Sequence, residues 1–151
     1  MSYASIYQLG VLQYLKGQPR KLDTDEYRWG LDASYSDLWY NGWDHGKRYG
    51  TPDQFKAKAR EARAKIRQAA ADRIGKPWDN CTRDDDNAVW TVNDVAKKLY
   101  PGYLEGRTLE HYACRYAVEV AHDELCIHSA EQNLSAIRSK SRNIIDSLIG
   151  Q

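Results

Sequence analysis

Apolar residues recur every three or four positions along several stretches of this chain, which is the spacing of a helix with one buried face. The clearest stretch, 51–75, has its apolar positions on one narrow stripe: Phe55, Ala59, Ala62, Ile66, Ala69 or Ala70, and Ile74. Thr51 and Gln54 have the spacing of a capping box, and Pro52 suits the first helical position. Gly75 suits the left-handed position that ends a helix. The sequence therefore predicts a helix over 52–74.

Three shorter stretches also have helical spacing. Residues 3–15 are expected to form an amphipathic helix. A second helix is expected to be capped by Asp23 or Thr24, with its last residue left open. Its apolar positions step by three and four: Tyr27, Leu31, Tyr35, Leu38, Trp39 and Trp43. A short helix over 91–99 is expected to begin at the capping residue Thr91.

The last part of the chain, 107–149, contains no glycine or proline. One continuous helix here would be about 63 Å long at about 1.5 Å per residue, which is longer than a compact domain of this size is wide. Ser129 and Gln132 form a second capping box, so we expect the helix to break near His128. Apolar positions near and after the break again step by three and four: Ile127, Ala130, Leu134, Ile137, Ser141, Ile144 and Leu148. Residues 108–127 are apolar on two sides and are expected to form the central core helix.

Because every well-patterned segment is helical and none alternates for long as a strand does, we predict an all-α fold. We expect residues 1–151 to form a single helical domain, a compact bundle of about five to six helices. Gly42, Gly46 and Gly50 lie four apart, which permits two interpretations. In a helix they would form a flat stripe for close packing, and outside one they would form a loop of freely rotating backbone.

Charge is unevenly distributed, although the net charge is only +1. Residues 47–76 contain 10 basic and 3 acidic groups, whereas residues 77–127 contain 5 basic and 10 acidic groups. A basic block followed by an acidic block suits either pairing between the two blocks or separate surfaces for oppositely charged partners. We favour internal pairing.

The basic block nevertheless provides the leading hypothesis for function. Six cations lie on the predicted helix outside its apolar stripe: Lys56, Lys58, Arg60, Arg63, Lys65 and Arg67. Clustered cations bind nucleic acid because they release counterions from the phosphates. We therefore expect a small non-enzymatic binding protein that associates with nucleic acid through the basic helix 52–74.

The alternative is a protein–protein interaction module, such as a phage-type inhibitor or adaptor. The first third of the chain is rich in Tyr and Trp, which suit the centres of protein interfaces. The candidate contact residues there are Trp39, Tyr40 and Trp43. The acidic segment 77–127 is a second candidate surface, because it could mimic nucleic acid. The partner is thus nucleic acid or a protein, and a homodimer is also left open.

Catalytic and metal-binding motifs are missing from the sequence. It has no phosphate loop, dinucleotide fingerprint, nucleophile elbow or His-Glu-x-x-His motif, so we favour a non-enzymatic role with no cofactor. The run 84–86 of aspartates lacks EF-hand spacing, and His111 and His122 would lie about 16 Å apart on a helix, too far to share one metal ion. We therefore expect no metal site.

Two further classes are disfavoured. Segments 91–99 and 107–117 resemble a helix-turn-helix DNA reader, but the connection between them is too long and the second segment carries Glu110, which would face phosphates. No apolar run approaches the roughly 20 residues that cross a bilayer, so no membrane partner is expected. Three cysteines without an export signal indicate a reduced, cytoplasmic protein.

Overall fold

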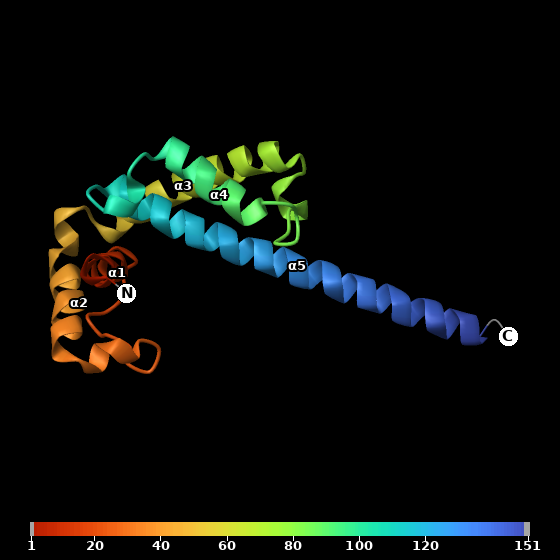
Figure 1. Ribbon diagram of the computed structural model, residues 1–151, viewed down its shortest axis with the longest axis horizontal. Helices are drawn as coiled ribbons and strands as arrows, with labels where there is room; N and C mark the ends of the chain where they lie inside the picture. Colours follow the sequence, from red (N-terminus) through yellow and green to blue (C-terminus); the bar gives the residue numbers. More distant parts are fainter. Residues whose placement is uncertain (1, 150–151) are drawn as a thin grey trace. The chain divides into compact units, whose positions relative to one another are not determined.

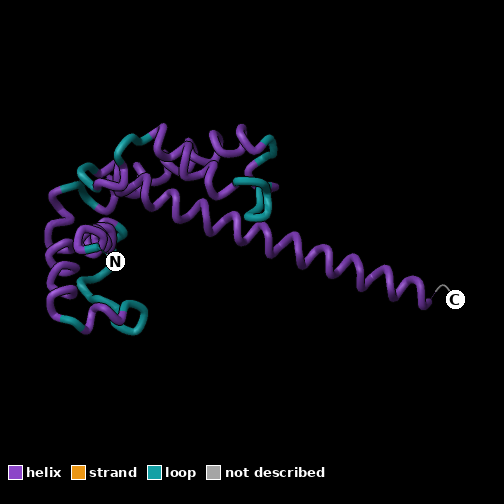
Figure 2. The backbone as a smooth tube through the Cα atoms, viewed as in Figure 1, coloured by secondary structure: helices purple, strands orange, loops and turns teal. Residues whose placement is uncertain are grey.

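A computed structural model describes residues 2–149; for residues 146 and 147 it describes the backbone but not the side chains. Within this range the chain contains five α-helices and no strand (Figure 1). The helices are α1 (Tyr3–Leu15), α2 (Ala33–His45), α3 (Pro52–Ile74), α4 (Ala88–Leu99) and α5 (Leu109–Ile149). Short 3₁₀ turns lie in the connections, at Arg28–Leu31, Gly46–Arg48, Trp78–Asn80 and Tyr103–Glu105. Figure 2 shows how much of the chain is helical, and the predicted all-α fold is confirmed.

The chain forms two compact units. Unit 1 consists of the residues up to Ala62 together with Tyr100–Ala117, and unit 2 of Arg63–Leu99 together with the residues from Val118 onward. Unit 1 therefore contains α1, α2 and the first parts of α3 and α5. Unit 2 contains α4 and the remaining parts of α3 and α5.

The backbones of α1 and α2 approach each other closely in unit 1. A Cβ atom on Gly10 would lie 2.0 Å from the carbonyl oxygen of Trp39, and a Cβ atom on Gly42 would lie 2.0 Å from the carbonyl oxygen of Tyr7. Only glycine leaves room for this crossing. Close packing, one of the two interpretations of the glycine spacing, is therefore correct for Gly42, whereas Gly50 lies in the loop before α3.

Two clusters of buried apolar side chains form the core of unit 1. One cluster joins α1, α3 and α5 through Val11, Leu12, Leu15, Phe55, Ala59, Tyr112 and Ala113. The other contains Ile6, Leu22 and Trp39. Partly buried aromatic rings surround both clusters: Tyr7, Tyr14, Tyr27, Trp29, Tyr35, Tyr40, Trp43, Tyr49 and Tyr116. Much of the aromatic content of the first third of the chain therefore stabilises the core.

Small and branched apolar side chains make up the interior of unit 2. Its buried aliphatic residues are Ile66, Ala70, Ala71, Ala88, Val92, Val95, Ala96, Val118, Ala121 and Leu125. Alanine lets helices approach closely, as its stripe on α3 predicts. No helix in the described part of the chain is both long enough and apolar enough to cross a bilayer.

The local signals that predict α3 are all present in the structure. The Thr51 N–H donates to Oε1 of Gln54 at 2.9 Å, and the Gln54 N–H donates to Oγ1 of Thr51 at 3.2 Å. Pro52 is the first helical residue, and Gly75 follows the last with a φ of 86°. The predicted helix over 52–74 is confirmed at both ends.

The predicted start of the second helix at Asp23 or Thr24 is wrong. α2 begins after Asp32, whose Oδ1 accepts the N–H of Ser34 at 2.9 Å. Asp23 caps only an isolated turn, in which its Oδ1 accepts two backbone N–H groups at 3.0 and 3.2 Å. Both aspartates carry the same capping chemistry, and the sequence pattern selected the earlier one.

The predicted start of α4 at Thr91 is also wrong, since the helix begins three residues earlier, at Ala88. Asn87, immediately before it, has a φ of 58°, and its carbonyl oxygen accepts the Thr91 N–H at 2.8 Å. The Thr91 hydroxyl donates instead to the Asn87 carbonyl oxygen at 2.8 Å, from inside the helix.

The predicted break near His128 does not occur, because α5 continues unbroken to Ile149. The side chains that resemble a capping box bind a distant loop instead. Oγ of Ser129 accepts the Arg83 N–H at 2.9 Å, and the Gln132 amide donates to the Asn80 carbonyl oxygen at 3.5 Å. Without a glycine or proline in this segment, nothing local interrupts the helix.

Candidate functional site

The cations of the first part of α3 belong to unit 1. Lys56 and Arg60 are exposed, and neither forms an ion pair with any residue that the structure describes. Lys58 is half-buried, with its Nζ 3.8 Å from Glu61 and 3.7 Å from Glu110. Three of the six predicted cations thus lie on unit 1, and one of the three already has carboxylate neighbours.

The other predicted cations, Arg63, Lys65 and Arg67, lie on unit 2, where Glu124 of α5 holds the two arginines. Arg67 donates to Oε1 of Glu124 from Nη2 at 2.6 Å and from Nε at 3.2 Å. Arg63 lies 3.8 Å from the same carboxylate, and Trp78 Nε1 donates to its other oxygen at 3.0 Å. Burial opposes ionisation of Glu124, but the hydrogen bonds from Arg67 and Trp78 lower its pKa below the ordinary value.

Several acidic partners of the basic block therefore come from residues 77–127. Glu124 pairs with two arginines, Glu110 lies beside Lys58, and Asp85 pairs with Lys76. The prediction of internal pairing between the two blocks is confirmed at these positions. A carboxylate that neutralises an arginine reduces what that arginine can offer to phosphate.

The three aromatic residues proposed as a protein interface have contacts within unit 1. Trp39 is only 3% exposed and meets Tyr40 edge-to-face, with 5.0 Å between the ring centroids. The guanidinium of Arg20 lies 4.7 Å from the centre of the Tyr40 ring. Trp43 donates from Nε1 to the Gln18 carbonyl oxygen at 3.2 Å. The structure thus places Trp39 in the core and leaves parts of the other two rings at the surface.

Two adjoining hollows on unit 1 share Tyr49 and Arg107. The first, the tyrosine hollow, has a volume of about 530 Å³ and is lined by the four tyrosines Tyr3, Tyr7, Tyr49 and Tyr112, together with Gln8 and Arg107. The second, the cationic hollow, has a volume of about 550 Å³ and is lined by Arg48, Lys58 and Arg107, together with Tyr49, Gln54 and Glu110. Aromatic faces and guanidinium groups therefore occur side by side.

Gln8 of α1 fixes the wall of the tyrosine hollow. Its amide donates to the carbonyl oxygens of Leu104 at 3.2 Å and Glu105 at 3.1 Å, and its Oε1 accepts a hydrogen bond from Arg115. Gly106, the residue after Glu105, has a left-handed φ of 64°, and a Cβ atom on it would lie 2.7 Å from the Gln8 amide nitrogen. Residues 104–106 are held against α1 in this way, and the next residue of the chain is Arg107.

The hydroxyls of Tyr7 and Tyr112 remain protonated at neutral pH. Burial, and next the neighbouring Tyr49 hydroxyl, raise the pKa of Tyr7 to about 12, and Tyr7 bonds His45 Nδ1 at 2.8 Å. Burial and the proximity of Tyr49 also raise the pKa of Tyr112. The Tyr112 side chain is 1% exposed, and its hydroxyl meets no hydrogen-bond partner among the described residues. The hydroxyl lies beneath Gly106, where an added Cβ atom would come within 2.9 Å of it, so the wall of the hollow encloses it.

Sequence reasoning predicted only Lys58 among the residues that line these hollows. Arg48 and Arg107 lie 59 positions apart in the sequence (107 − 48), so no local pattern joins them to each other or to Lys58. The available signal was the turn between α4 and α5, where Gly102 and Gly106 both have left-handed backbone, with φ of 72° and 64°. Two glycines four positions apart in the sequence are typical of such a sharply folded segment, and Arg107 directly follows the second.

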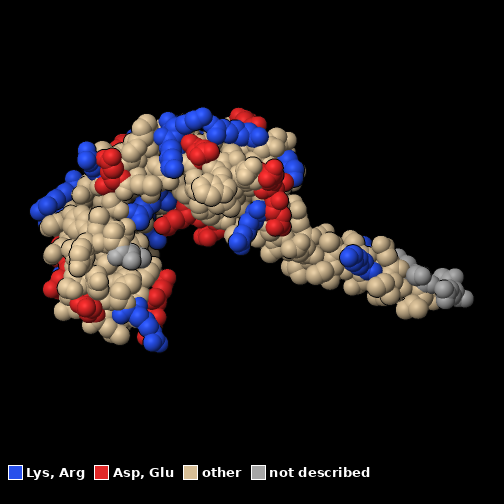
Figure 3. Space-filling view, viewed as in Figure 1, with Lys and Arg blue, Asp and Glu red and all other residues tan. Residues whose placement is uncertain are grey.

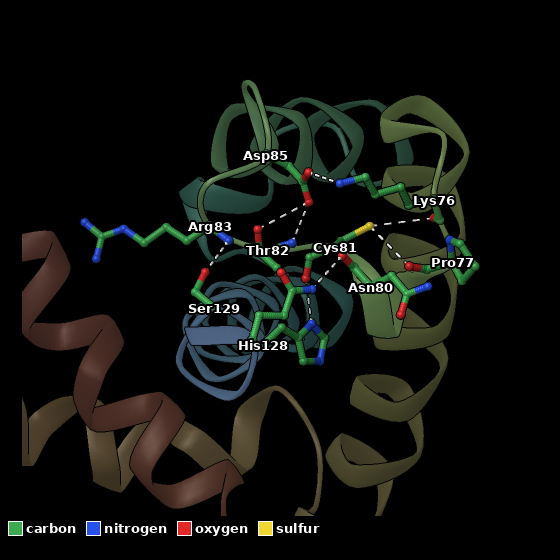
Figure 4. A network of polar contacts seen from close by, with 10 residues as sticks. Lys76, Pro77, Asn80, Cys81, Thr82, Arg83, Asp85, His128 and Ser129 are labelled. Carbon is green, nitrogen blue, oxygen red and sulfur yellow. Dashed lines mark hydrogen bonds and ion pairs between the residues drawn. The ribbon is translucent and has the colours of Figure 1, made fainter. Parts of the chain in front are cut away.

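A second polar cluster, in unit 2, joins the loop after α3 to α5 (Figure 4). His128 Nδ1 lies 2.7 Å from the Cys81 carbonyl oxygen, while the Cys81 thiol donates to the carbonyl oxygens of Lys76 at 3.6 Å and Pro77 at 3.5 Å. Burial raises the pKa of Cys81, and the side chain is fully buried. A protonated thiol bound to two carbonyls cannot act as a nucleophile at neutral pH. The cluster therefore fastens the loop and is not a catalytic Cys–His pair.

The acidic run 84–86 contributes to the same loop. The ion pair with Lys76, and next the Thr82 N–H, lower the pKa of Asp85. Its Oδ2 accepts the Thr82 N–H at 2.6 Å, so this carboxylate shapes the loop. No group of three or more His, Cys, Asp or Glu side chains in the described residues could hold a metal ion.

Comparison of the chain with protein-family models, with curated proteins and with solved structures found no significant match in any of the three.

Proposed function

We propose that this chain is a non-enzymatic binding protein whose unit 1 binds single-stranded nucleic acid at the tyrosine and cationic hollows. The observation that carries the proposal is that the two hollows share Tyr49 and Arg107. A ligand bound there would meet aromatic faces and cations within a few ångströms. Single strands present bases and phosphates at that spacing, and proteins bind them by stacking bases on aromatic rings and following the backbone with cations.

The chemistry of each hollow supports this division of roles. Tyr3 is 63% exposed and offers its ring to a base, while Tyr7 and Tyr49 line the same hollow. Arg48, Lys58 and Arg107 supply positive charge on the adjoining side. Arg107 shares its charge with Glu105, 3.1 Å from its Nε, and Lys58 shares its charge with Glu61 and Glu110. Neutral phenols suit base edges and phosphate oxygens, because an ionised phenolate would repel the backbone.

Part of the basic helix belongs to this proposal. Lys58 lines the cationic hollow, and Lys56 and Arg60 are exposed on the same part of α3. Arg63 and Arg67 share their charge with Glu124, so they contribute less than their number suggests. Binding of duplex DNA would need a continuous basic surface or an element that enters the major groove. Binding of a single strand needs only a few cations beside aromatic rings.

The test is fluorescence anisotropy with labelled oligo-dT and oligo-rU at low and at physiological salt. We expect binding that weakens as salt rises, with the logarithmic salt slope falling by about 0.7 for each phosphate-contacting cation removed. Arg107→Ala should reduce affinity and lower this slope, because Arg107 lines both hollows. Tyr3→Ala should reduce affinity with an unchanged slope, by a factor of about 5 to 100 for one stacked base.

Arg83→Ala is the matched control. Arg83 is an exposed arginine of unit 2, and only its backbone N–H takes part in the loop cluster, as Figure 4 shows. This variant should bind like the wild type. Binding that is absent at low salt, or equal losses in the control and in Arg107→Ala, would refute the proposal. In that case the protein–protein alternative becomes the hypothesis to pursue, through Tyr40 and Trp43, because Trp39 is buried in the core.

A further inference from the structure

The last part of α5 carries an apolar surface that no residue of the described chain covers. Every side chain described between Ala130 and Ile149 is exposed. Seven large aliphatic residues from position 127 onward are between 53% and 77% exposed: Ile127, Leu134, Ile137, Ile144, Ile145, Leu148 and Ile149. Figure 3 shows this part of the helix as mostly uncharged on the face in view. Apolar patches of this kind mark interaction surfaces.

The order of these residues gives a strict seven-residue repeat. From Ile127 to Leu148, six apolar residues and one serine alternate in steps of three and four: Ile127, Ala130, Leu134, Ile137, Ser141, Ile144 and Leu148. In heptad notation the a positions are 127, 134, 141 and 148, and the d positions are 130, 137 and 144. A repeat of 3.5 residues per turn is the pattern of a left-handed coiled coil between helices.

Contacts within unit 2 leave this a/d face open. The loop after α3 touches α5 at three positions in the first heptad, namely His128, Ser129 and Gln132. These are the b, c and f positions, which lie on the outer side of a coiled coil. The loop therefore covers the side of the helix that a coiled-coil partner would not use.

Two charged residues flank the stripe at successive e positions, Glu131 and Arg138. They line the same shallow hollow along the helix as Leu134, with a volume of about 320 Å³. The opposite flank, at the g positions, has Cys126, Asn133 and Lys140. The e flank therefore carries both a negative and a positive side chain, whereas the g flank carries no negative one. This asymmetry determines which helix orientation brings opposite charges together.

We propose that a second copy of this chain packs on this face in antiparallel orientation. In a parallel pair each g position faces the following e position of the other helix, which places Cys126 opposite Glu131 and Asn133 opposite Arg138, with no opposite charges together. In an antiparallel pair e faces e. Glu131 of each chain then lies beside Arg138 of the other, and the symmetry forms this ion pair twice.

The same charges fix the register. With the twofold axis between positions 134 and 137, Leu134 packs against Ile137 of the second copy and Ile127 against Ile144. The small residues Ala130 and Ser141 then share a layer, so between positions 127 and 144 no large side chain faces a small one. A shift of one heptad in either direction places Glu131 opposite Glu131 or Arg138 opposite Arg138. Like charges disfavour both shifts.

The test is the molar mass of the full chain by light scattering over a range of concentrations. We expect a dimer that dissociates on dilution. Glu131→Arg alone and Arg138→Glu alone should each weaken it about tenfold, because two attractive pairs become repulsive. The double variant should recover wild-type affinity, because the pairs are restored with opposite sign. Single and double variants that dimerise equally would refute the antiparallel pairing.

Two further variants separate a lost surface from a lost fold. Ile137→Asp should give a monomer, whereas Ser139→Asp, on the outer side at position f, should remain a dimer; far-ultraviolet circular dichroism should show equal helix content at low concentration. Leu at a with Ile at d favours three or four chains in parallel coiled coils, so a mass above that of two chains would overturn the proposal. A wild type that remains monomeric at all concentrations would also overturn it. Neither result bears on oligonucleotide binding by unit 1.

Discussion

Gly10→Ala should destabilise unit 1 severely, although alanine is the better helix former. The added methyl would lie 2.0 Å from the Trp39 carbonyl oxygen and 2.8 Å from the Trp43 nitrogen, where ordinary contact begins at 3.4 Å. Both neighbours are backbone atoms and cannot rotate away. The helices must therefore separate by about 1.4 Å, the difference between 3.4 and 2.0 Å.

The size of the effect follows from what the separation opens. Ile6 and Trp39 are buried beside the crossing, and burial of each side chain stabilises the fold by about 1.5–3 kcal/mol. A gap of about 1 Å between the helices would remove about a quarter to a half of that stabilisation. Residual strain adds about 1–3 kcal/mol, and the gain in helix propensity returns about 1 kcal/mol. The net loss is about 1–5 kcal/mol of the free energy of unfolding, measured by urea denaturation with tryptophan fluorescence.

A matched change and a second glycine test this reasoning. Ala57→Gly, at an exposed position of α3, should cost only the propensity difference of about 1 kcal/mol. Gly42→Ala should resemble Gly10→Ala, because its methyl would lie 2.0 Å from the Tyr7 carbonyl oxygen. The double variant should be less destabilised than the sum of the two, since helices already moved apart admit the second methyl. A Gly10→Ala protein as stable as the wild type would refute the close crossing.

The remaining predictions concern unit 2 and the thiols. The stability of unit 2 should fall as the pH decreases below about 5, because Glu124 has a lower pKa in the folded state than in the unfolded state. The stabilisation by ionised Glu124 is lost as the pH falls through the unfolded-state pKa of about 4.3 toward the folded-state pKa. Urea denaturation of Glu124→Gln should show a flatter pH dependence, and an unchanged one would contradict this account. Cys126 is exposed and should react quickly with a thiol reagent in the native protein, whereas Cys81 and Cys114 should react only after unfolding, since both are buried and burial raises the pKa of Cys114 to about 12. If a second thiol reacted quickly in the native protein, the burial described for Cys81 or Cys114 would be wrong.

α3 could be predicted to the residue because everything that starts and stops it is local. Thr51, Gln54 and Pro52 act within one turn, and Gly75 needs only its own backbone. The break expected at His128 failed for the opposite reason. The Ser129 side chain that resembles a cap binds Arg83, which lies 46 positions away in the sequence. Capping chemistry in a sequence is therefore reliable only when no distant group competes for it.

The candidate site was only partly accessible to the same reasoning. A helix pattern places six cations on α3, but their neighbours come from other segments. Glu124 of α5 engages Arg67, while Arg48 and Arg107 join Lys58 at the cationic hollow. Charge counts along the chain indicate that neutralisation will occur, and the prediction of internal pairing rests on them. Which cations stay available depends on tertiary placement.

The loop after α3 is held to α5 through its backbone: the Asn80 and Cys81 carbonyls and the Arg83 N–H make the bonds. Side chains that follow in the loop, such as the exposed Asp84, make none of these bonds. A nitroxide label attached at Asp84→Cys, in a variant that lacks the exposed Cys126 thiol, would therefore be attached to a backbone segment that is fixed to α5. Pulsed spin-resonance between two such labels would measure the geometry of an assembled pair directly.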